Sequence, residues 1–362
     1  MAAPLVRTIS VFRASLPLDR PYPVAMATFT ELDALIAKIE ADDGNVGWGE
    51  VTIVPGYTHE TVESGLAFCL AHAPQLLRMN PVRAKRHLLP FVATEPHAVS
   101  ALMTALEMLE RHWLLVPAET HRIEVLAPVR SLGADEIQDE VATLLAKGHR
   151  TLKVKVGFRS VSEDLARLQM IAKAASDGAM LRVDANQGYS RSDAIRFAQE
   201  IDPAVVELFE QPCDKQDWDS NAAVAAVSNV PVMLDESVYN FADIQRAAGI
   251  DGVGYVKIEM EKFGGVEMAK TGLEMIRACG MVPVAGNGAA SDISSWMEAC
   301  TARLTVDVPC EMHGFLKLKT PLLQDPLPFV DGAIVLAPGY FPRVDESAVS
   351  RFATFTQQFG AE

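Results

Sequence analysis

The chain has 362 residues, of which 49% are hydrophobic and 22% charged, so it can bury a large core and is not a disordered polypeptide. Its formal net charge of −15 and pI near 5.0 disfavour contact with phosphate backbones and anionic lipid, which excludes nucleic acid and membranes as expected partners. With no long apolar run, and with five scattered cysteines that include no CxxC pair, we expect a cytoplasmic protein with reduced thiols and neither signal peptide nor membrane span.

The first third of the chain mixes strand-like and helical segments. Strand-like runs span 5–12, 28–40 and 46–51. The polar turn Asp42–Asn45 between the last two runs is typical of a hairpin. The stretch 98–115 has apolar residues at helical spacing and no breaker, which predicts a long helix. Together these segments predict an α+β unit over residues 1–121.

From about residue 122 onward, short and often β-branched apolar runs alternate with helical stretches. The runs span 123–127, 151–156, 180–185, 205–209, 230–234, 254–258, 282–285 and, with the weakest signal, 308–312. Eight alternating units predict a parallel barrel rather than an open sheet. The barrel would occupy residues 122–330, and we expect the last segment, 331–362, to return to the first unit.

Ionisable side chains recur at the ends of consecutive runs. They are Lys153 and Lys155 in the second run, Asp184 in the third, Glu210 after the fourth, Asp235 after the fifth and Lys257 in the sixth. From Lys155 to Lys257, successive positions lie 22 to 29 residues apart, which is one strand–helix unit each. Because the carboxyl ends of all strands in a parallel barrel open on one face, we expect these groups to converge there.

Three converging carboxylates repel one another unless a cation neutralises them. Oxygen ligands from Asp184, Glu210 and Asp235, with no cysteine or histidine among them, favour magnesium. Each residue alone could be a helix cap or a surface charge. Five consecutive units with an ionisable residue at the same relative position are not expected by chance. We therefore predict a magnesium site flanked by lysines of the second and sixth runs.

These motifs resemble the enolase superfamily, and within it the muconate-lactonizing-enzyme subgroup. The matching segments are Thr151-Leu-Lys-Val-Lys-Val-Gly157, Leu181-Arg-Val-Asp-Ala-Asn186, Glu207-Leu-Phe-Glu-Gln-Pro212, Leu234-Asp-Glu-Ser237, and Lys257 with the later Phe263-Gly-Gly-Val266. The segment Val46-Gly-Trp-Gly-Glu50 resembles a strand and turn of the family's capping domain. The resemblance implies a modified (β/α)7β TIM barrel with an α+β N-terminal capping domain, a bound magnesium ion and a homo-oligomer.

The resemblance also implies a role for each residue. In this family a base removes the proton beside a magnesium-bound substrate carboxylate, and an enolate-like intermediate forms. Lys155 and Lys257 would then be the acid and base on opposite faces, with Lys153 as an electrostatic helper, and the three carboxylates would be the metal ligands. A neutral lysine is needed as base at pH 7, and nearby positive charge lowers a lysine's pKa.

Two departures from relatives narrow the reaction. Gly286-Asn287-Gly288 follows the seventh run without the histidine of the mandelate racemases, and Cys310-Glu311-Met312 stands where dipeptide epimerases carry Asp-x-Asp. Loops near 21–26 and 55–58 are expected to select the substrate, with Met26 and Pro55 among their residues. The candidate substrate contacts are Asn186, Asn287, Tyr57 and Glu311. Glu311 could equally be a hydrogen-bonded structural carboxylate.

Two opposed lysines favour an isomerase that racemises or epimerises the α-carbon of a small carboxylate, with amino- and imino-acid derivatives among the candidates. Dehydration of a β-hydroxy acid or hydroxy-amino acid, a lyase reaction, uses the same groups and stays open. Cycloisomerisation of the muconate type stays open for the same reason. A barrel that only binds ligands is disfavoured, because the lysines and carboxylates are intact.

Overall fold

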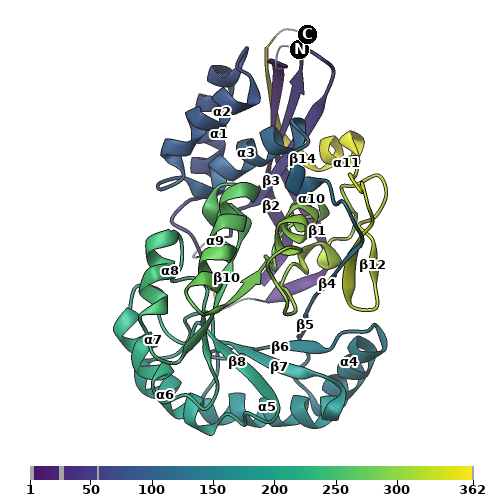
Figure 1. Cartoon of the computed structure of the whole chain (residues 1–362). Coiled ribbons are helices and arrows are strands. Elements are labelled where there is room, and N and C mark those ends of the chain that lie inside the picture. Colours follow the sequence, from purple (N-terminus) through teal and green to yellow (C-terminus); the bar gives the residue numbers. More distant parts are fainter. Residues whose placement is uncertain (1–3, 24–27, 55–56, 361–362) are drawn as a thin grey trace.

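The computed structural model describes residues 4–23, 28–54 and 57–360, so Met26 and Pro55 lie outside the described residues (Figure 1). Within these residues the strands form three sheets: one of four strands, one of seven and one of three. Among the described helices, none combines the length and apolar character that a membrane crossing needs. The described cysteines are all free thiols.

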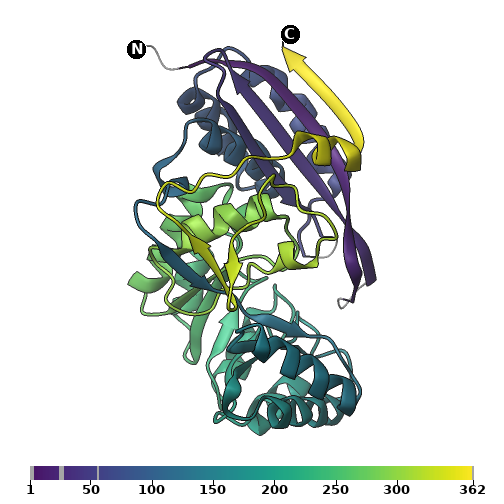
Figure 2. The ribbon, with the colours of Figure 1, turned by 90° about the vertical axis from the view of Figure 1, so that its right-hand side faces the viewer.

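The four-stranded antiparallel sheet joins the two ends of the chain. Its strands, in spatial order, are β14 (Ala353–Gly360), β1 (Val6–Pro23), β2 (Thr28–Ala41) and β3 (Val46–Thr52). The predicted hairpin connects β2 and β3, where the amide of Ala41 donates to the Asn45 carbonyl at 2.9 Å. Figure 2 shows β14 along the edge of this sheet, beside β1.

Helices cover one face of this sheet. They are α1 (Val62–Leu76), α2 (Pro81–Leu88) and α3 (Pro96–Leu109). The predicted long helix ends at Leu109 rather than at residue 115, because Arg111 takes a left-handed φ of 50° and a 3-10 turn, η2 (Trp113–Leu115), follows. Gly47 and Gly49 of β3 let the α3 backbone approach closely, since a Cβ on Gly49 would lie 2.2 Å from the Ala101 carbonyl oxygen.

A curled, seven-stranded parallel sheet forms the second unit (Figure 1). Its strands are β5 (Ala127–Val129), β6 (Thr151–Lys155), β7 (Met180–Asp184), β8 (Val206–Glu210), β9 (Val232–Leu234), β10 (Val253–Ile258) and β11 (Val282–Ala285). The helices between them are α4 (Ala134–Ala146), α5 (Val161–Ala175), α6 (Arg191–Glu200), α7 (Trp218–Ala225), α8 (Phe241–Ala248) and α9 (Val266–Ala278), and α10 (Asp292–Ala302) follows β11.

The first and eighth predicted runs differ from expectation. Run 123–127 is divided, because β4 (His121–Glu124) pairs antiparallel with β13 (Ala333–Leu336) and only β5 enters the barrel. Run 308–312 forms no regular strand, and Pro309 in it has no N–H to donate. Its backbone still links β4 to β11: the amide of Cys310 donates to the Glu124 carbonyl at 2.7 Å and that of Glu311 to the Ala285 carbonyl at 2.8 Å.

The remaining elements complete the chain. They are β12 (Phe329–Val330), α11 (Glu346–Phe352), and the 3-10 helices η1 (Leu89–Phe91), η3 (Ser176–Gly178), η4 (Met260–Phe263) and η5 (Gly314–Lys317). The mixed α/β architecture agrees with the predicted barrel and α+β capping unit. The division into 1–121, 122–330 and 331–362 stays a prediction.

We expect Gly49→Ala to lower the free energy of unfolding by about 1–3 kcal/mol, because the new Cβ meets backbone atoms of α3 that cannot move aside. Urea denaturation followed by circular dichroism measures the change as a lower midpoint. Gly249→Ala is the matched control, since Gly249 has φ −84° and its Cβ would meet only a carbonyl oxygen at 3.4 Å. Equal midpoints for the two variants would contradict the close packing of α3 on β3.

Candidate active site

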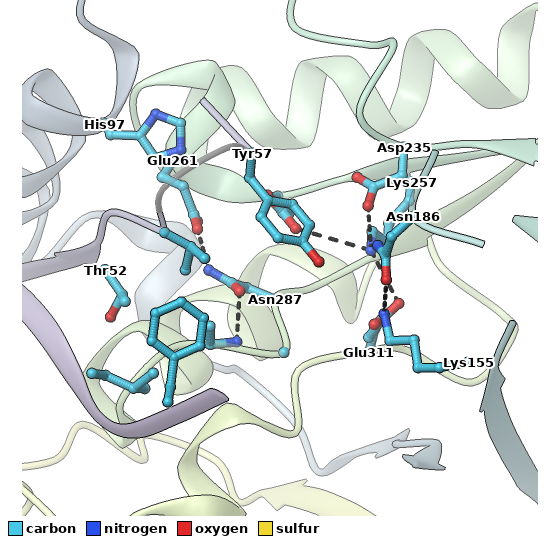
Figure 3. A pocket seen from close by; sticks show the side chains of 16 residues that line it. Thr52, Tyr57, His97, Lys155, Asn186, Asp235, Lys257, Glu261, Asn287 and Glu311 are labelled. Carbon is cyan, nitrogen blue, oxygen red and sulfur yellow. Dashed lines mark hydrogen bonds and ion pairs between the residues drawn. The ribbon is translucent and has the colours of Figure 1, made fainter. Parts of the chain in front are cut away.

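The predicted ionisable residues meet at the carboxyl ends of the barrel strands. Strand register places Lys155 beside Asp184 and Asp184 beside Glu210. A pocket lies between these strand ends and the capping unit (Figure 3). Its walls include seven predicted site residues, namely Lys155, Lys257, Asp235, Asn186, Asn287, Glu311 and Tyr57. The other three, Lys153, Asp184 and Glu210, are buried.

Two buried lysines form the centre of the site. The Lys153 Nζ lies 2.8 Å from both Asp184 Oδ2 and Glu210 Oε2, and it also bonds Glu311. The Lys257 Nζ lies 2.8 Å from Glu210 Oε1, 2.7 Å from Asp235 Oδ2 and 3.1 Å from Glu311 Oε2. Glu210 and Glu311 therefore each bridge both lysines.

The pKa values of these groups follow from burial and from the close charges. Burial alone lowers the pKa of Lys153, but Asp184, Glu210 and Glu311 outweigh it and raise the value. The pKa of Lys257 is raised in the same way, with Asp235 as the largest contributor. Burial and neighbouring carboxylates raise the pKa of Glu210 to about 7. The two lysines are held as cations, and negative charge accumulates around them.

Lys155 reaches the pocket from β6. Its side chain is 20% exposed, whereas that of Lys153 is 1% exposed. The Lys155 Nζ lies 2.6 Å from Asp184 Oδ2 and also bonds the Asn186 side-chain oxygen. Asn186 in turn donates from Nδ2 to Glu236 Oε1 at 2.9 Å. Lys155 is thus the more exposed lysine of the pair on β6, and Asn186 fixes its position.

Sequence reasoning missed Lys262, which lies between Lys257 and the glycine pair. Its Nζ lies 2.6 Å from Asp235 Oδ1, and its side chain is 2% exposed. Burial raises the pKa of Asp235, but Lys257 and Lys262 outweigh burial and lower it. The only signal in the sequence was a basic residue in the segment after the sixth strand.

Asn287, another predicted contact, lies on the opposite side of the pocket from Lys155 (Figure 3). Asn287 bonds Glu261 through its Nδ2, and its Oδ1 accepts from the amide of Ala289 at 2.7 Å. Burial raises the pKa of Glu261 well above its usual range, with Glu259 adding to the effect. In the view of Figure 3, Tyr57 lies between this pair and the lysine side of the pocket. Glu261 was not predicted from the sequence.

The carboxylates at the strand ends fit a hard divalent cation. Oxygens of Asp184, Glu210 and Glu311 lie within 4.8 Å of one another. One carboxylate oxygen of Glu236 is buried without a hydrogen-bond partner, and burial, with Asp235 and Asp184, raises the pKa of Glu236 to about 8. The lysines therefore do not balance all the negative charge, and an all-oxygen donor set suits Mg²⁺. Asp235, predicted as the third ligand, is held by Lys257 and Lys262.

Two family matches cover most of the chain. Residues 136–347 match the family described as Enolase C-terminal domain-like. Residues 6–108 match the N-terminal domain of the mandelate racemase / muconate lactonizing enzyme family. The two matches follow one another along the chain, so both units belong to one known architecture.

Curated relatives and solved structures agree with these matches. The L-Ala-D/L-Glu epimerase of Bacillus subtilis is 27% identical over 294 residues, covering 77% of this chain and 80% of that protein. Muconate cycloisomerase 1 of Acinetobacter baylyi is 25% identical over 367 residues, covering 96% and 99%. The dipeptide epimerase of Cytophaga hutchinsonii, solved with Mg and the dipeptide D-Ala-L-Val, shares the fold with a TM-score of 0.88 at 19% identity, covering 98% and 100%.

We propose Asp184, Glu210 and Asp235 as magnesium ligands, because Asp184 and Glu210 end β7 and β8 and Asp235 directly follows the adjacent β9. Calorimetric titration of chelator-treated protein with MgCl₂ should show at least about tenfold weaker binding for Asp184→Asn, Glu210→Gln and Asp235→Asn. Glu311→Gln should stay within about threefold of the native affinity. Glu274→Gln, an exposed carboxylate on α9, is the control. Loss of affinity in Glu311→Gln with none in Asp235→Asn would assign the third ligand to Glu311 instead.

Proposed function

Because the chain belongs to the enolase superfamily, in its muconate-lactonizing-enzyme subgroup, we propose that it is an isomerase that racemises or epimerises the α-carbon of a small carboxylate substrate. One observation carries the proposal. Lys155 on β6 and Lys257 on β10 line the same pocket, and three strands lie between them in the sheet. Two ammonium groups that reach one pocket from different strands can serve the two faces of a single carbon.

The proton chemistry divides between these two lysines. The lysine on one face, in its neutral form, takes the α-proton, and the protonated lysine on the other face returns a proton with inversion. For the opposite enantiomer the roles exchange. When Lys257 is the base, positive charge added to the pocket must lower its raised pKa. The buried Lys153 stays a cation and offsets negative charge next to Lys155. When bound, Mg²⁺ supplies positive charge that stabilises the negative charge developing beside the substrate carboxylate.

The pocket walls favour a substrate with an amino or imino group. Glu259, Glu261 and Asn287 line the pocket together with the two lysines. Carboxylate and amide oxygens accept hydrogen bonds from ammonium groups, and Glu311 lies within the same pocket. The Asp-x-Asp pattern of dipeptide epimerases is absent from the eighth run. A small amino- or imino-acid derivative therefore fits the walls better than a dipeptide.

We expect single enantiomers from a library of amino- and imino-acid carboxylates, incubated with Mg²⁺ in D₂O, to gain deuterium at the α-carbon with inversion. Lys155→Ala and Lys257→Ala should each lower racemisation by at least about 10²-fold. Each variant should still exchange the α-proton of the one enantiomer that faces its remaining lysine. Proton NMR and chiral chromatography separate exchange from inversion.

Lys270→Ala removes a partly buried lysine on α9 that does not line the pocket; it is the control and should racemise at the native rate. Loss of water to give a keto acid or an enamine would replace the racemase assignment with dehydration. Formation of a lactone would replace it with cycloisomerisation. No exchange with any carboxylate, despite magnesium binding, would reject catalysis.

A further inference from the structure

The backbone carbonyl of Tyr57 accepts two hydrogen bonds from the barrel. Lys215 donates from its Nζ at 2.8 Å, and Tyr239 donates from its hydroxyl at 2.5 Å. Tyr57 follows β3 of the capping unit, Lys215 lies in the loop after β8, and Tyr239 lies in the loop after β9. The Tyr57 carbonyl is therefore held by two donors that come from different loops of the barrel.

Both donors are themselves held in place by the barrel. The backbone amide of Lys215 donates to Gln187 Oε1 at 3.0 Å, in the loop that follows β7. The ring of Tyr239 lies under the Lys262 ammonium, 5.2 Å from Nζ to the ring centroid. Lys262 is the residue that bonds Asp235. A short series of contacts therefore connects the strand ends of the site to the capping segment.

Direct packing between the capping unit and the barrel is interrupted beside these contacts. A cleft there is lined by His59, Val92 and Pro96 of the capping unit. From the barrel, Trp218 and Phe241 line it, together with Lys215 and Tyr239. Because side chains do not fill this cleft, packing does not join the capping unit to the barrel at this point. The hydrogen bonds to the Tyr57 carbonyl join them instead.

We propose that Tyr239 and Lys215 are positioning residues that hold Tyr57 against the substrate pocket, and so determine how tightly the substrate binds. The Tyr57 side chain lines the pocket with Lys155 and Lys257, whereas neither donor does. Their effect on the substrate therefore passes through Tyr57. If Tyr57 is already held in its binding position, substrate binding costs less conformational entropy. Removing the hydrogen bonds to its carbonyl restores that entropic cost. The inference rests on the proposed function, because it concerns the same pocket.

Chymotrypsin, which cleaves after tyrosine, tests the anchoring without any substrate. In the full-length protein, Tyr239→Phe removes only the hydroxyl, and Lys215→Met removes the ammonium but keeps an unbranched side chain of similar length. We expect cleavage after Tyr57, followed by mass spectrometry of the intact fragments, to be at least about fivefold faster in both variants than in the native protein. Tyr340→Phe is the control and should be cleaved at the native rate, because the Tyr340 hydroxyl has no hydrogen-bond partner. Native rates in both test variants would overturn the proposal.

Kinetics with the substrate found in the D₂O screen test the consequence for binding. We expect KM to rise at least about fivefold in Tyr239→Phe and Lys215→Met while kcat stays within about twofold, since the reacting lysines are untouched. A native KM in both variants, or a loss confined to kcat, would overturn the positioning role. If the native protein turns over no carboxylate while the variants are cleaved faster, the proposed function fails and the anchoring of Tyr57 stands.

Discussion

The need to balance buried charge at the strand ends governs this structure. Lys153 and Lys257 are almost fully buried, and each has three carboxylates within 3.1 Å of its Nζ. A buried cation without such partners would cost several kcal/mol, so the lysines and carboxylates must reach the same point together. They do so only in the observed register, which sets Lys155 beside Asp184 and Asp184 beside Glu210. A shift of one residue would turn these side chains to the other face of the sheet. The pairing of buried charges therefore fixes both the register of the barrel strands and the geometry of the site.

Two carboxylates of the capping unit, Glu107 and Glu50, bond it to helices of the barrel. Glu107 of α3 accepts from the amides of Val266 and Glu267 at 3.0 and 3.2 Å, and so caps α9 in place of a local side chain. Glu50 of β3 accepts from the Ser291 hydroxyl at 2.9 Å, at the N-cap of α10. Both carboxylates lie at helix N-termini, where N–H groups and the helix dipole favour negative charge. The capping segments that line the pocket are thereby fixed to the barrel that carries the lysines.

Much of this arrangement was predictable from short-range patterns. Short apolar runs that end at or beside Lys155, Asp184 and Glu210 predict strands. Because parallel strands end at the same edge of a sheet, the pattern also predicts that these side chains lie together. The division of run 123–127 was not predictable, since the partner of β4 is β13, about 200 residues later. The bridging by Glu311 was also hidden, because it comes from an irregular run. The hydrogen bonds to the Tyr57 carbonyl join three loops, and no local pattern in the sequence marks them.

The charge balance also explains why the strand ends alone do not select a reaction. Burial and the neighbouring carboxylates together raise the pKa of Glu210 to about 7 and that of Glu236 to about 8, despite the lysines that face them. A substrate carboxylate would add negative charge to the same place, so its binding and the release of a proton from a pocket lysine both depend on added positive charge. That requirement holds for racemisation, dehydration and cycloisomerisation alike. What differs between these reactions is the substrate's other substituents, and the pocket offers them the side chains of Glu261, Asn287 and Tyr57. We therefore expect the walls that lie away from the lysines to decide among these reactions.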